Sequence, residues 1–496
     1  MLKKMCSRWN KIGILGILLL LLFCAGCGSQ RFHPPLSPID ISALKEPQPD
    51  GTLSTADGDA QIWLEETEHS WGLEERRVYV LPNGDLFYQV RLSFADNTQV
   101  EEVTTDVLFF PTETLVRRYD QDSQEWFASP LGPGQIRCGQ YHVQYAGGSG
   151  LLVGPQTYRQ QENQMLEYLP EQDGWFRSSS TDGGWQMELC TPVTPGAQAE
   201  YMYLLSLETL IDWEDPATQI LWAAYDFTEE NRWCYQGYYY DTPDTYIPSG
   251  DQYFHRLPAA YIPAQCGDQE GRACYDLALV MLHVMLELQN DQGFFPTMAG
   301  SQWLLEDYGI QAGFYDTRFN SDLVEALLHM DAKHNIPEFA DGAIRYGQYY
   351  ETMAETHHYT LDYQGQEAWL VWDYTHPKGC QPNHCSLNHQ IAEILVLFQL
   401  YDRTGYEAYE DLALLLLNGI LAIGTDWILD DNDLAYAYLP DGSLGMQDYP
   451  YLTYNDLFDL CQVLDQRYGS HDPLLDTLME AKRNWMDRNG VEGYKQ

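Results

Sequence analysis

The stretch ACYDLALVMLHVMLELQ, residues 273–289, decides the fold class of this protein. It is apolar on most faces over about five helical turns, which is typical of a helix buried in a protein core. Short and long connections alternate between the helices that follow, so we expect residues 270–490 to form helical hairpins curled into an incomplete (α/α) toroid. The further helical patterns lie at residues 321–334, 337–355, 386–403, 406–423, 453–468 and 473–487.

The chain before that helix, residues 51–255, has the pattern of antiparallel β-structure. A hairpin is predicted for residues 78–94, because Asn83-Gly84 lies between two apolar runs and supplies the positive φ angles of a tight turn. We therefore expect a multidomain β + α protein, in which an antiparallel β-sandwich or barrel region precedes an independently packed toroid. The domain boundary is expected in the proline-rich residues 241–268. Further strands are predicted at residues 141–145, 151–153, 185–190, 201–207 and 219–227.

The composition excludes whole classes of function. Among 496 residues there are 73 acidic and only 27 basic side chains, which gives a net charge of −46. Nucleic-acid binders need a basic surface, so no nucleic-acid partner is expected. The aromatic fraction of 14%, which includes 36 Tyr, is high and suits β-sheets, carbohydrate-binding grooves or both.

The N-terminus predicts the compartment. Four basic residues precede an apolar run at residues 12–23, and Cys24-Ala25-Gly26-Cys27, which resembles a bacterial lipobox, follows it. We expect residues 1–26 to be a lipoprotein signal peptide and Cys27 to carry the lipid that anchors an extracytoplasmic protein to the bacterial cell membrane. Residues 27–50 are expected to be a proline-rich tether. An uncleaved anchor and an ordinary secretory signal stay open as alternatives.

The loops of the helical part contain the candidate chemistry. Arg318 lies between Asp316 and Asp322, so it either forms a local salt bridge or binds a sugar carboxylate with its planar fork. Two other loops contain a carboxylate next to a tyrosine, Asp373-Tyr374 and Asp448-Tyr449. A neighbouring carboxylate can orient a phenol and change its proton affinity, which suits general acid/base catalysis.

The residues after Tyr374 include histidines and cysteines that could bind a metal ion. The intervals of four residues within residues 376–389 could bring ligands together if that stretch were helical, but Pro377 and Pro382 interrupt it. A Cys380–Cys385 disulfide is an equal alternative, and no metal or cofactor is expected. The residues concerned are His376, Cys380, His384, Cys385 and His389.

Four segments of the helical part occur in the order of motifs from a known family. They are Gly293-Phe294-Phe295-Pro296, residues 313–321, Asp373-Tyr374-Thr375 with the later Leu387-Asn388, and residues 448–455. With these motifs the helical part resembles the C-terminal domain of glucuronyl C5-epimerases, which invert uronic acids within heparan-type chains. Where that family has Tyr-x-x-Arg, this chain has Tyr436 and Tyr438 without the arginine.

The resemblance implies a glycan substrate and proton abstraction at C5 of a uronic acid. It implies Tyr374 and Tyr449 as the catalytic acid and base, with Asp373 orienting them. Removing a proton beside a carboxylate builds charge that the site must offset. The residues that the resemblance implies for holding the sugar are Tyr315, Arg318, Asn320, Asn388 and Tyr438.

Three other functions stay open. A uronate polysaccharide lyase would form the same intermediate, and a glycosidase would use two carboxylates from among Asp316, Asp373 and Asp448. A non-catalytic glycan-binding lipoprotein would need only an aromatic-lined cleft. The strong negative charge would repel a highly sulfated chain, so a sparsely charged glycan is expected.

Overall fold

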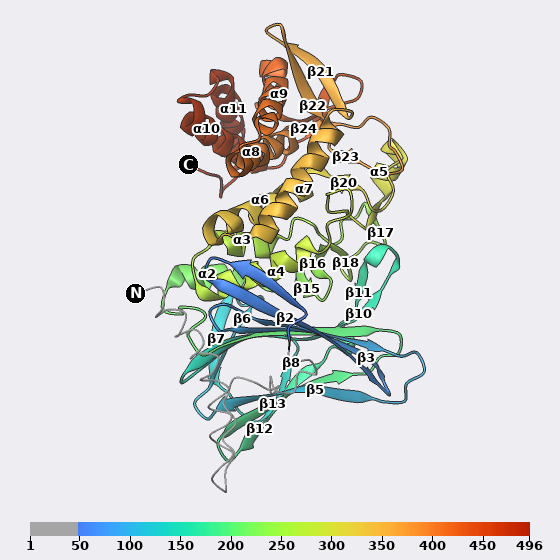
Figure 1. Ribbon diagram of the computed structural model, residues 1–496, viewed down its shortest axis with the longest axis vertical. Helices are drawn as coiled ribbons and strands as arrows, with labels where there is room; N and C mark the ends of the chain where they lie inside the picture. The colour runs from blue at the N-terminus through green and yellow to red at the C-terminus, as the bar shows by residue number, and fades with distance from the viewer. Residues whose placement is uncertain (1–47) are drawn as a thin grey trace.

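The computed structural model describes residues 48–496, with a β-rich part below a helical part in Figure 1. The predicted signal peptide, Cys27 and most of the predicted tether lie outside the described residues. The larger sheet contains β1 (Gly51–Thr55), β2 (Gly58–His69), β3 (Gly72–Val80), β4 (Leu86–Phe94), β6 (Leu115–Asp120), β7 (Glu125–Pro130), β9 (Gln140–Tyr145), β10 (Gly148–Gln160), β11 (Leu166–Tyr168), β14 (Gln198–Ser206), β15 (Asn231–Cys234), β16 (Gly237–Asp241) and β18 (Tyr253–Arg256). The smaller sheet has the order β5 (Glu102–Pro111), β13 (Gly184–Pro192), β12 (Trp175–Thr181) and β8 (Gly134–Arg137).

All pairings within these two sheets are antiparallel, and the larger sheet runs β1-β2-β3-β4-β14-β10-β11-β18-β16-β15. It branches where β9 also pairs with β10 and then with β6. The alternation of side chains buries both of its faces. Val78 and Tyr88 point toward a core shared with the smaller sheet, whereas Tyr79 and Phe87 point toward the helices. The region is thus antiparallel, as expected, but this branched sheet is not a simple sandwich or barrel.

The predicted hairpin at residues 78–94 is confirmed, with Val80 paired to Leu86. Only Gly84 of the Asn-Gly pair has a positive φ, of 89°. The Asn83 side chain instead donates to Asp276 of α4 at 2.6 Å. The predicted strand at residues 219–227 is wrong, because Asp215 caps Ala217 N and Pro216 begins helix α2 (Pro216–Ala224) there.

All seven predicted long helices are present. They are α4 (Arg272–Leu286), α6 (Thr317–His334), α7 (Pro337–Ala354), α8 (Leu387–Thr404), α9 (Glu407–Ile423), α10 (Leu452–Tyr468) and α11 (Pro473–Asn489). Helix α6 begins a turn earlier than predicted, because the side chain of Asp316 accepts from Phe319 N and caps it. Besides α2, two further short helices were not predicted, α3 (Tyr261–Asp268) and α5 (Gln302–Tyr308).

The long helices form a curved row of hairpins (Figure 1). Helices α6, α8 and α10 pack side by side, and each packs against its successor, α7, α9 or α11. This arrangement agrees with an incomplete toroid of helical hairpins. Among the described residues, Glu407–Trp427 is long and apolar enough to span a membrane, but Gly419 within it packs so closely that an added Cβ would lie 2.0 Å from Trp369 O of β22 (Gln366–Val371).

The helical part does not pack independently, contrary to our expectation. One continuous core joins Leu53, Ile62 and Phe87 of the larger sheet to Leu282 of α4 and Leu478 of α11. The proline-rich residues 241–268 are not a free linker either, because β18 pairs with β11 and β16 and α3 packs against α4 and α6. The two parts therefore share a core, and the boundary between them is a packed interface.

Candidate functional site

The candidate site lies at the N-terminal ends of three neighbouring helices. Asp316 immediately precedes α6, Ser386 precedes α8, and Tyr449 lies just before α10. These three helices pack side by side, and the loops that lead into them meet, because the charges of Asp316 and Asp373 both reach Tyr449. Helix N-termini also carry partial positive charge, which favours ionised carboxylates nearby.

Two short ladders hold these loops together. Strand β20 (Tyr315–Asp316) pairs with β23 (Tyr374–Thr375), which places Asp316 opposite Tyr374. Strand β24 (Cys385–Ser386) pairs with β25 (Ala435–Tyr438), which itself pairs with β26 (Leu444–Gln447). Backbone hydrogen bonds therefore join three loops that are far apart in the sequence.

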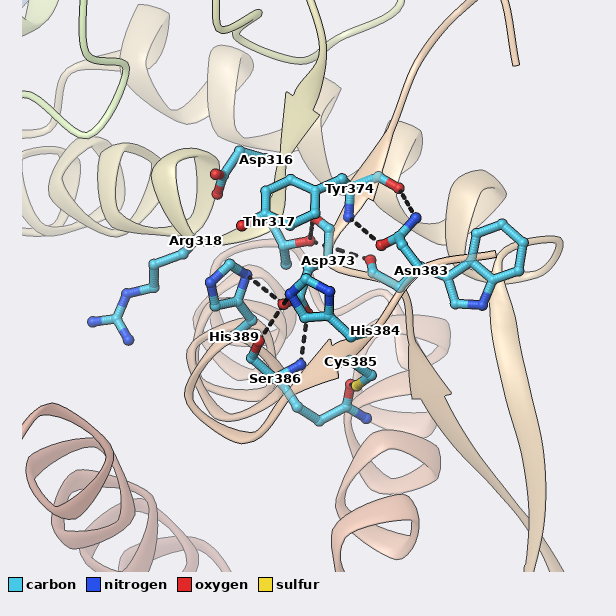
Figure 2. A network of polar contacts seen from close by, with 12 residues as sticks. Asp316, Thr317, Arg318, Asp373, Tyr374, Asn383, His384, Cys385, Ser386 and His389 are labelled. Atoms are coloured by element: carbon cyan, nitrogen blue, oxygen red, sulfur yellow. Dashed lines mark hydrogen bonds and ion pairs between the residues drawn. The ribbon is translucent and has the colours of Figure 1, made fainter. Parts of the chain in front are cut away.

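Asp373 is at the centre of the polar network in Figure 2. Its carboxylate is 1% exposed and accepts from the backbone N of Ser386 at 2.8 Å and from the hydroxyl of the same residue. His384 Nε2 and His389 Nδ1 lie 3.2 Å and 3.6 Å from the same carboxylate. Burial alone would raise the pKa of Asp373, but the two imidazoles and the Ser386 hydroxyl outweigh it and lower the pKa below its usual value. Asp373 is therefore ionised.

Each imidazole links Asp373 to a tyrosine. The far nitrogen of His384, Nδ1, lies 3.1 Å from the hydroxyl of Tyr308, and that of His389, Nε2, lies 3.4 Å from the hydroxyl of Tyr436. Burial lowers the pKa of His389 to about 4, so its imidazole is neutral near pH 7. A neutral imidazole between a carboxylate and a phenol has one nitrogen to donate and one to accept a proton.

Asp316 differs from Asp373 in its protonation. Burial, opposed by the Phe319 N–H and assisted by the charge of Asp373, raises the pKa of Asp316 to about 8. The charge of Asp316 in turn adds to burial in raising the pKa of both Tyr374 and Tyr449. Asp316 thus lies within electrostatic reach of both predicted catalytic tyrosines, and near pH 7 it is mainly a proton donor.

The two tyrosines differ in accessibility. Tyr374 is 8% exposed and packs against the rings of Phe314 and His389. Tyr449 is 51% exposed, and its ring lies 5.7 Å from that of Tyr436. Tyr449 is therefore the phenol of this group that a substrate reaches directly.

Arg318 forms the salt bridges that we had considered as one of its two roles. Its Nε lies 2.8 Å from Asp322, and its two terminal nitrogens lie 2.6 Å and 3.3 Å from Asp456. In Figure 2 its side chain extends away from Asp373. With two carboxylates already bound, the guanidinium has no free fork for the carboxylate of a sugar.

Two of the residues that we expected to hold the sugar are buried away from any surface. The hydroxyl of Tyr315 lies 2.8 Å from that of Tyr346, which donates to Glu393. The side chain of Asn320 bonds both the N and the O of Phe295, at 2.7 Å and 3.0 Å. Both side chains therefore hold the loops in place and do not face a ligand.

The remaining predicted site residues, Asn388, Tyr438 and Asp448, differ in their burial and in their contacts. Asn388 is 1% exposed, and its Oδ1 has no hydrogen-bond partner among the described residues. Tyr438 is half-buried against the ring of Tyr359, at 5.3 Å. Asp448 is not a free carboxylate, because Lys482 lies 2.6 Å from it and also 2.6 Å from Asp433.

The residues that could hold a metal have other partners. Within residues 48–496, no group of three or more His, Cys, Asp or Glu side chains has an arrangement suited to a metal ion. His384 and His389 face Asp373, whereas Cys380 and Cys385 are free thiols. The disulfide alternative for these two cysteines is therefore wrong.

Sequence reasoning missed the parts of the network that depend on tertiary contacts. The two histidines were considered only as metal ligands, and Ser386 was not considered. The signal for Tyr436 was its place beside Tyr438 in the motif that lacks an arginine. No sequence signal pointed to Tyr308 or Lys482, which come from other helices.

The raised pKa of Asp316 predicts a pH-dependent stability. Between its ordinary pKa of 3.8 and about 8 the folded state holds one proton more than the unfolded state, so stability falls as pH rises across this window, by up to about 1.4 kcal/mol per pH unit. Asp316→Asn keeps an oxygen to cap Phe319 N and removes the titration. Its free energy of unfolding should therefore rise relative to the wild type from pH 5 to pH 8 in urea titrations.

A matched control is Asp120→Asn, which changes a surface carboxylate whose pKa is lowered by the Ser123 backbone and hydroxyl. Its stability relative to the wild type should not change with pH over the same window. If the stability of Asp316→Asn relative to the wild type were equally independent of pH, Asp316 would not be buried in its neutral form.

The chain resembles known proteins in its structure but not detectably in its sequence. Neither a protein-family profile nor a curated protein sequence matches the chain. Cellobiose 2-epimerase from Spirochaeta thermophila DSM 6192 is 12% identical with a TM-score of 0.36, and the match covers 47% of this chain and 59% of that chain. A family 76 glycoside hydrolase from a bovine Bacteroides thetaiotaomicron strain is 10% identical with a TM-score of 0.36, covering 86% and 78% of the two chains.

Unsaturated glucuronyl hydrolase from Bacillus sp. GL1 is 14% identical with a TM-score of 0.30, covering 46% of this chain and 59% of that chain. The chain spans only part of the length of these relatives, since it covers 59% of a D-mannose isomerase and 59% and 60% of two cellobiose 2-epimerases. All of these proteins are enzymes that act on sugars, but likeness at this level assigns no activity to this chain. Membership of the glucuronyl C5-epimerase family therefore stays a prediction.

Proposed function

We propose that this protein is a glycan-modifying enzyme of the epimerase type, which moves a proton at C5 of a uronic acid unit. The observation that carries the proposal is the convergence of Tyr374, Tyr436 and Tyr449 around Asp316 and the Asp373–His389 pair. We further propose that lipidated Cys27 tethers the enzyme to the outer side of the bacterial cell membrane.

Inversion at a carbon atom needs a base on one face of the sugar ring and an acid on the other. We assign these two roles to the predicted pair, in which half-exposed Tyr449 transfers a proton on one face of the sugar and Tyr374, at 8% exposure, transfers a proton on the other. The ring of Tyr449 contacts that of Tyr436, whose hydroxyl lies beside His389, and His389 in turn faces Asp373, so an ionised carboxylate supports this group of tyrosines from behind. Neutral Asp316 can donate to the substrate carboxylate without repelling it. In this proposal Asp316 takes over the role first expected of Arg318.

A glycosidase is the second candidate, because Asp316 is mainly protonated near pH 7 while Asp373 is ionised. Two carboxyl groups with pKa values pushed apart are the usual sign of an acid and its partner base. Asp373, however, is 1% exposed and already accepts from both the backbone and the hydroxyl of Ser386. It has no path to a sugar carbon, so we favour the epimerase.

Exchange of hydrogen for deuterium tests the proposal. A glucuronate-containing oligosaccharide incubated in heavy water with the wild type should gain deuterium at C5, as measured by NMR. Tyr449→Phe should reduce this exchange about 100-fold or more, because it removes a proton-transfer group and leaves the ring in place.

The control is Tyr451→Phe, which removes a phenol of similar exposure, 42%, from the same loop and should retain exchange. Full exchange in Tyr449→Phe would remove Tyr449 from the chemistry. New reducing ends without exchange would identify the glycosidase, and binding with neither reaction would identify a glycan-binding protein.

The proposed anchor has its own test. Cys27→Ala should abolish labelling with an alkyne fatty acid and release the protein from the membrane fraction of a bacterial host, since the sulfur of Cys27 is the expected acceptor of the lipid. Cys24→Ala is the matched control and should still be labelled. Membrane retention of Cys27→Ala would instead favour an uncleaved anchor.

A further inference from the structure

A cavity lies in the β-rich part, outside the candidate catalytic site. It has a volume of about 420 Å³ and opens beside strands β11, β15, β16 and β18. Among the residues that line it are Arg232, Tyr168, Phe254 and Glu230. This volume is within the range of sites for small ligands.

Arg232 is the unusual residue of this cavity. It is 4% exposed, and its guanidinium lies 4.4 Å from the ring centre of Tyr168 and 4.7 Å from that of Phe254. One terminal nitrogen donates to Gln156 Oε1 at 2.6 Å, but Nε is buried without a hydrogen-bond partner. Among residues 48–496, none of the ion pairs includes Arg232. A buried guanidinium without an anion is costly unless oxygen atoms approach its edge.

Four carboxylates line the same cavity without forming an ion pair with Arg232, and they come from Glu229, Glu230, Asp241 and Asp251. Burial and then the charge of Glu230 raise the pKa of Asp241. Burial and then the charge of Asp226 raise the pKa of Glu229. The cavity therefore has an excess of negative charge, which a cationic group on a ligand would relieve and which would repel a uronate.

A series of tyrosines connects the cavity to the candidate catalytic site. The hydroxyl of Tyr240 donates to Glu230 at 3.4 Å, and the ring of Tyr240 meets that of Tyr261 edge-on at 5.8 Å. Tyr261 is 37% exposed and lies close enough to Asp316 and Tyr449 for their charges to affect its pKa, after the larger effect of burial. Tyr240 and Tyr261 therefore extend an aromatic surface from the cavity toward Tyr449.

We propose that this cavity binds an amino-sugar unit of a glycan. The ammonium group would face the carboxylates of Glu230 and Asp241, and hydroxyl oxygens would accept from the edge of Arg232. A metal ion fits less well, because the described residues contain no cluster with metal-ligand geometry. A polyamine would supply cations but no acceptors for Arg232. That the same glycan extends along the tyrosines to Tyr449 rests on the proposed function, whereas binding in the cavity does not.

Equilibrium binding tests this site without reference to catalysis. Titration of the full chain with a trimer of glucosamine, followed by calorimetry, should show binding that weakens at least 10-fold when the trimer is N-acetylated. Glu230→Gln, at an exposed position where the fold should tolerate the change, should weaken binding of the glucosamine trimer about 5-fold or more. Arg232→Gln should weaken it further.

The matched control is Glu125→Gln, which removes an exposed carboxylate on β7 away from the cavity and should leave binding unchanged. Equal affinity for the acetylated trimer, or equally tight binding of tri-lysine, would overturn the proposal. Binding by the wild type without C5 exchange on a uronate glycan would disprove the proposed reaction and leave the amino-sugar site standing. Exchange by a wild type that does not bind the glucosamine trimer would disprove the amino-sugar site and leave the proposed reaction standing.

Discussion

Lys482→Met should lower the free energy of unfolding by about 3–5 kcal/mol, the usual cost of removing one member of a buried ion group. Lys482 is fully buried, and its ammonium lies 2.6 Å from Asp433 and 2.6 Å from Asp448. Without this cation two buried carboxylates face each other unpaired. The change should be visible as an earlier midpoint in urea denaturation followed by circular dichroism.

The same ammonium donates to the backbone oxygen of Tyr449 at 2.8 Å. The substitution should therefore also loosen the loop that carries Tyr449, so C5 exchange should fall even where the protein is still folded. Lys495→Met is the control, because Lys495 forms an exposed pair with Asp459, and such surface pairs contribute about 0–1 kcal/mol. A loss of less than 1 kcal/mol in Lys482→Met would contradict the buried triad.

Asp373→Asn should reduce C5 exchange about 100-fold or more, because it removes the charge that faces both imidazoles. The carboxylate of Asp373 counteracts part of the effect of burial on His389. The pKa of His389 should therefore fall below its present value of about 4, as measured by NMR of the imidazole. A loss of exchange that accompanies this shift in a folded protein identifies a positioning role, because a purely structural contact would change stability and not exchange in the folded state.

Asp373→Asn should also be less stable than the wild type at neutral pH. The folded state holds the pKa of Asp373 below its ordinary value of 3.8, so the stabilisation is present above pH 3.8 and is lost as pH falls below it. The difference between the two proteins should accordingly shrink in acid. Asp402→Asn, which removes an exposed partner of Arg467, is the control and should retain both exchange and stability. An unchanged pKa of His389 would disprove the positioning role.

The sequence alone determined the long helices and the hairpin at residues 78–94. These elements follow from local signals, because the apolar periodicity of a helix and the Asn83-Gly84 turn each act over a few neighbouring residues. The strand predicted at residues 219–227 failed because the cap at Asp215 and Pro216 outweighed the apolar run after it. The resemblance of the loops to glucuronyl C5-epimerase motifs, taken in order, chose Asp373, Tyr374 and Tyr449 as candidates, and their roles stay a prediction.

Only the tertiary structure decided what these residues contact. Asp373 meets His389 because α8 packs beside α6, and Asp448 meets Lys482 because α11 folds back on α10. The protonation of Asp316 and the pairing of Arg318 depend in the same way on burial and on partners distant in the sequence. Electrostatic energies depend on distance and on the exclusion of water, and neither quantity is defined until the loops at the helix ends have come together.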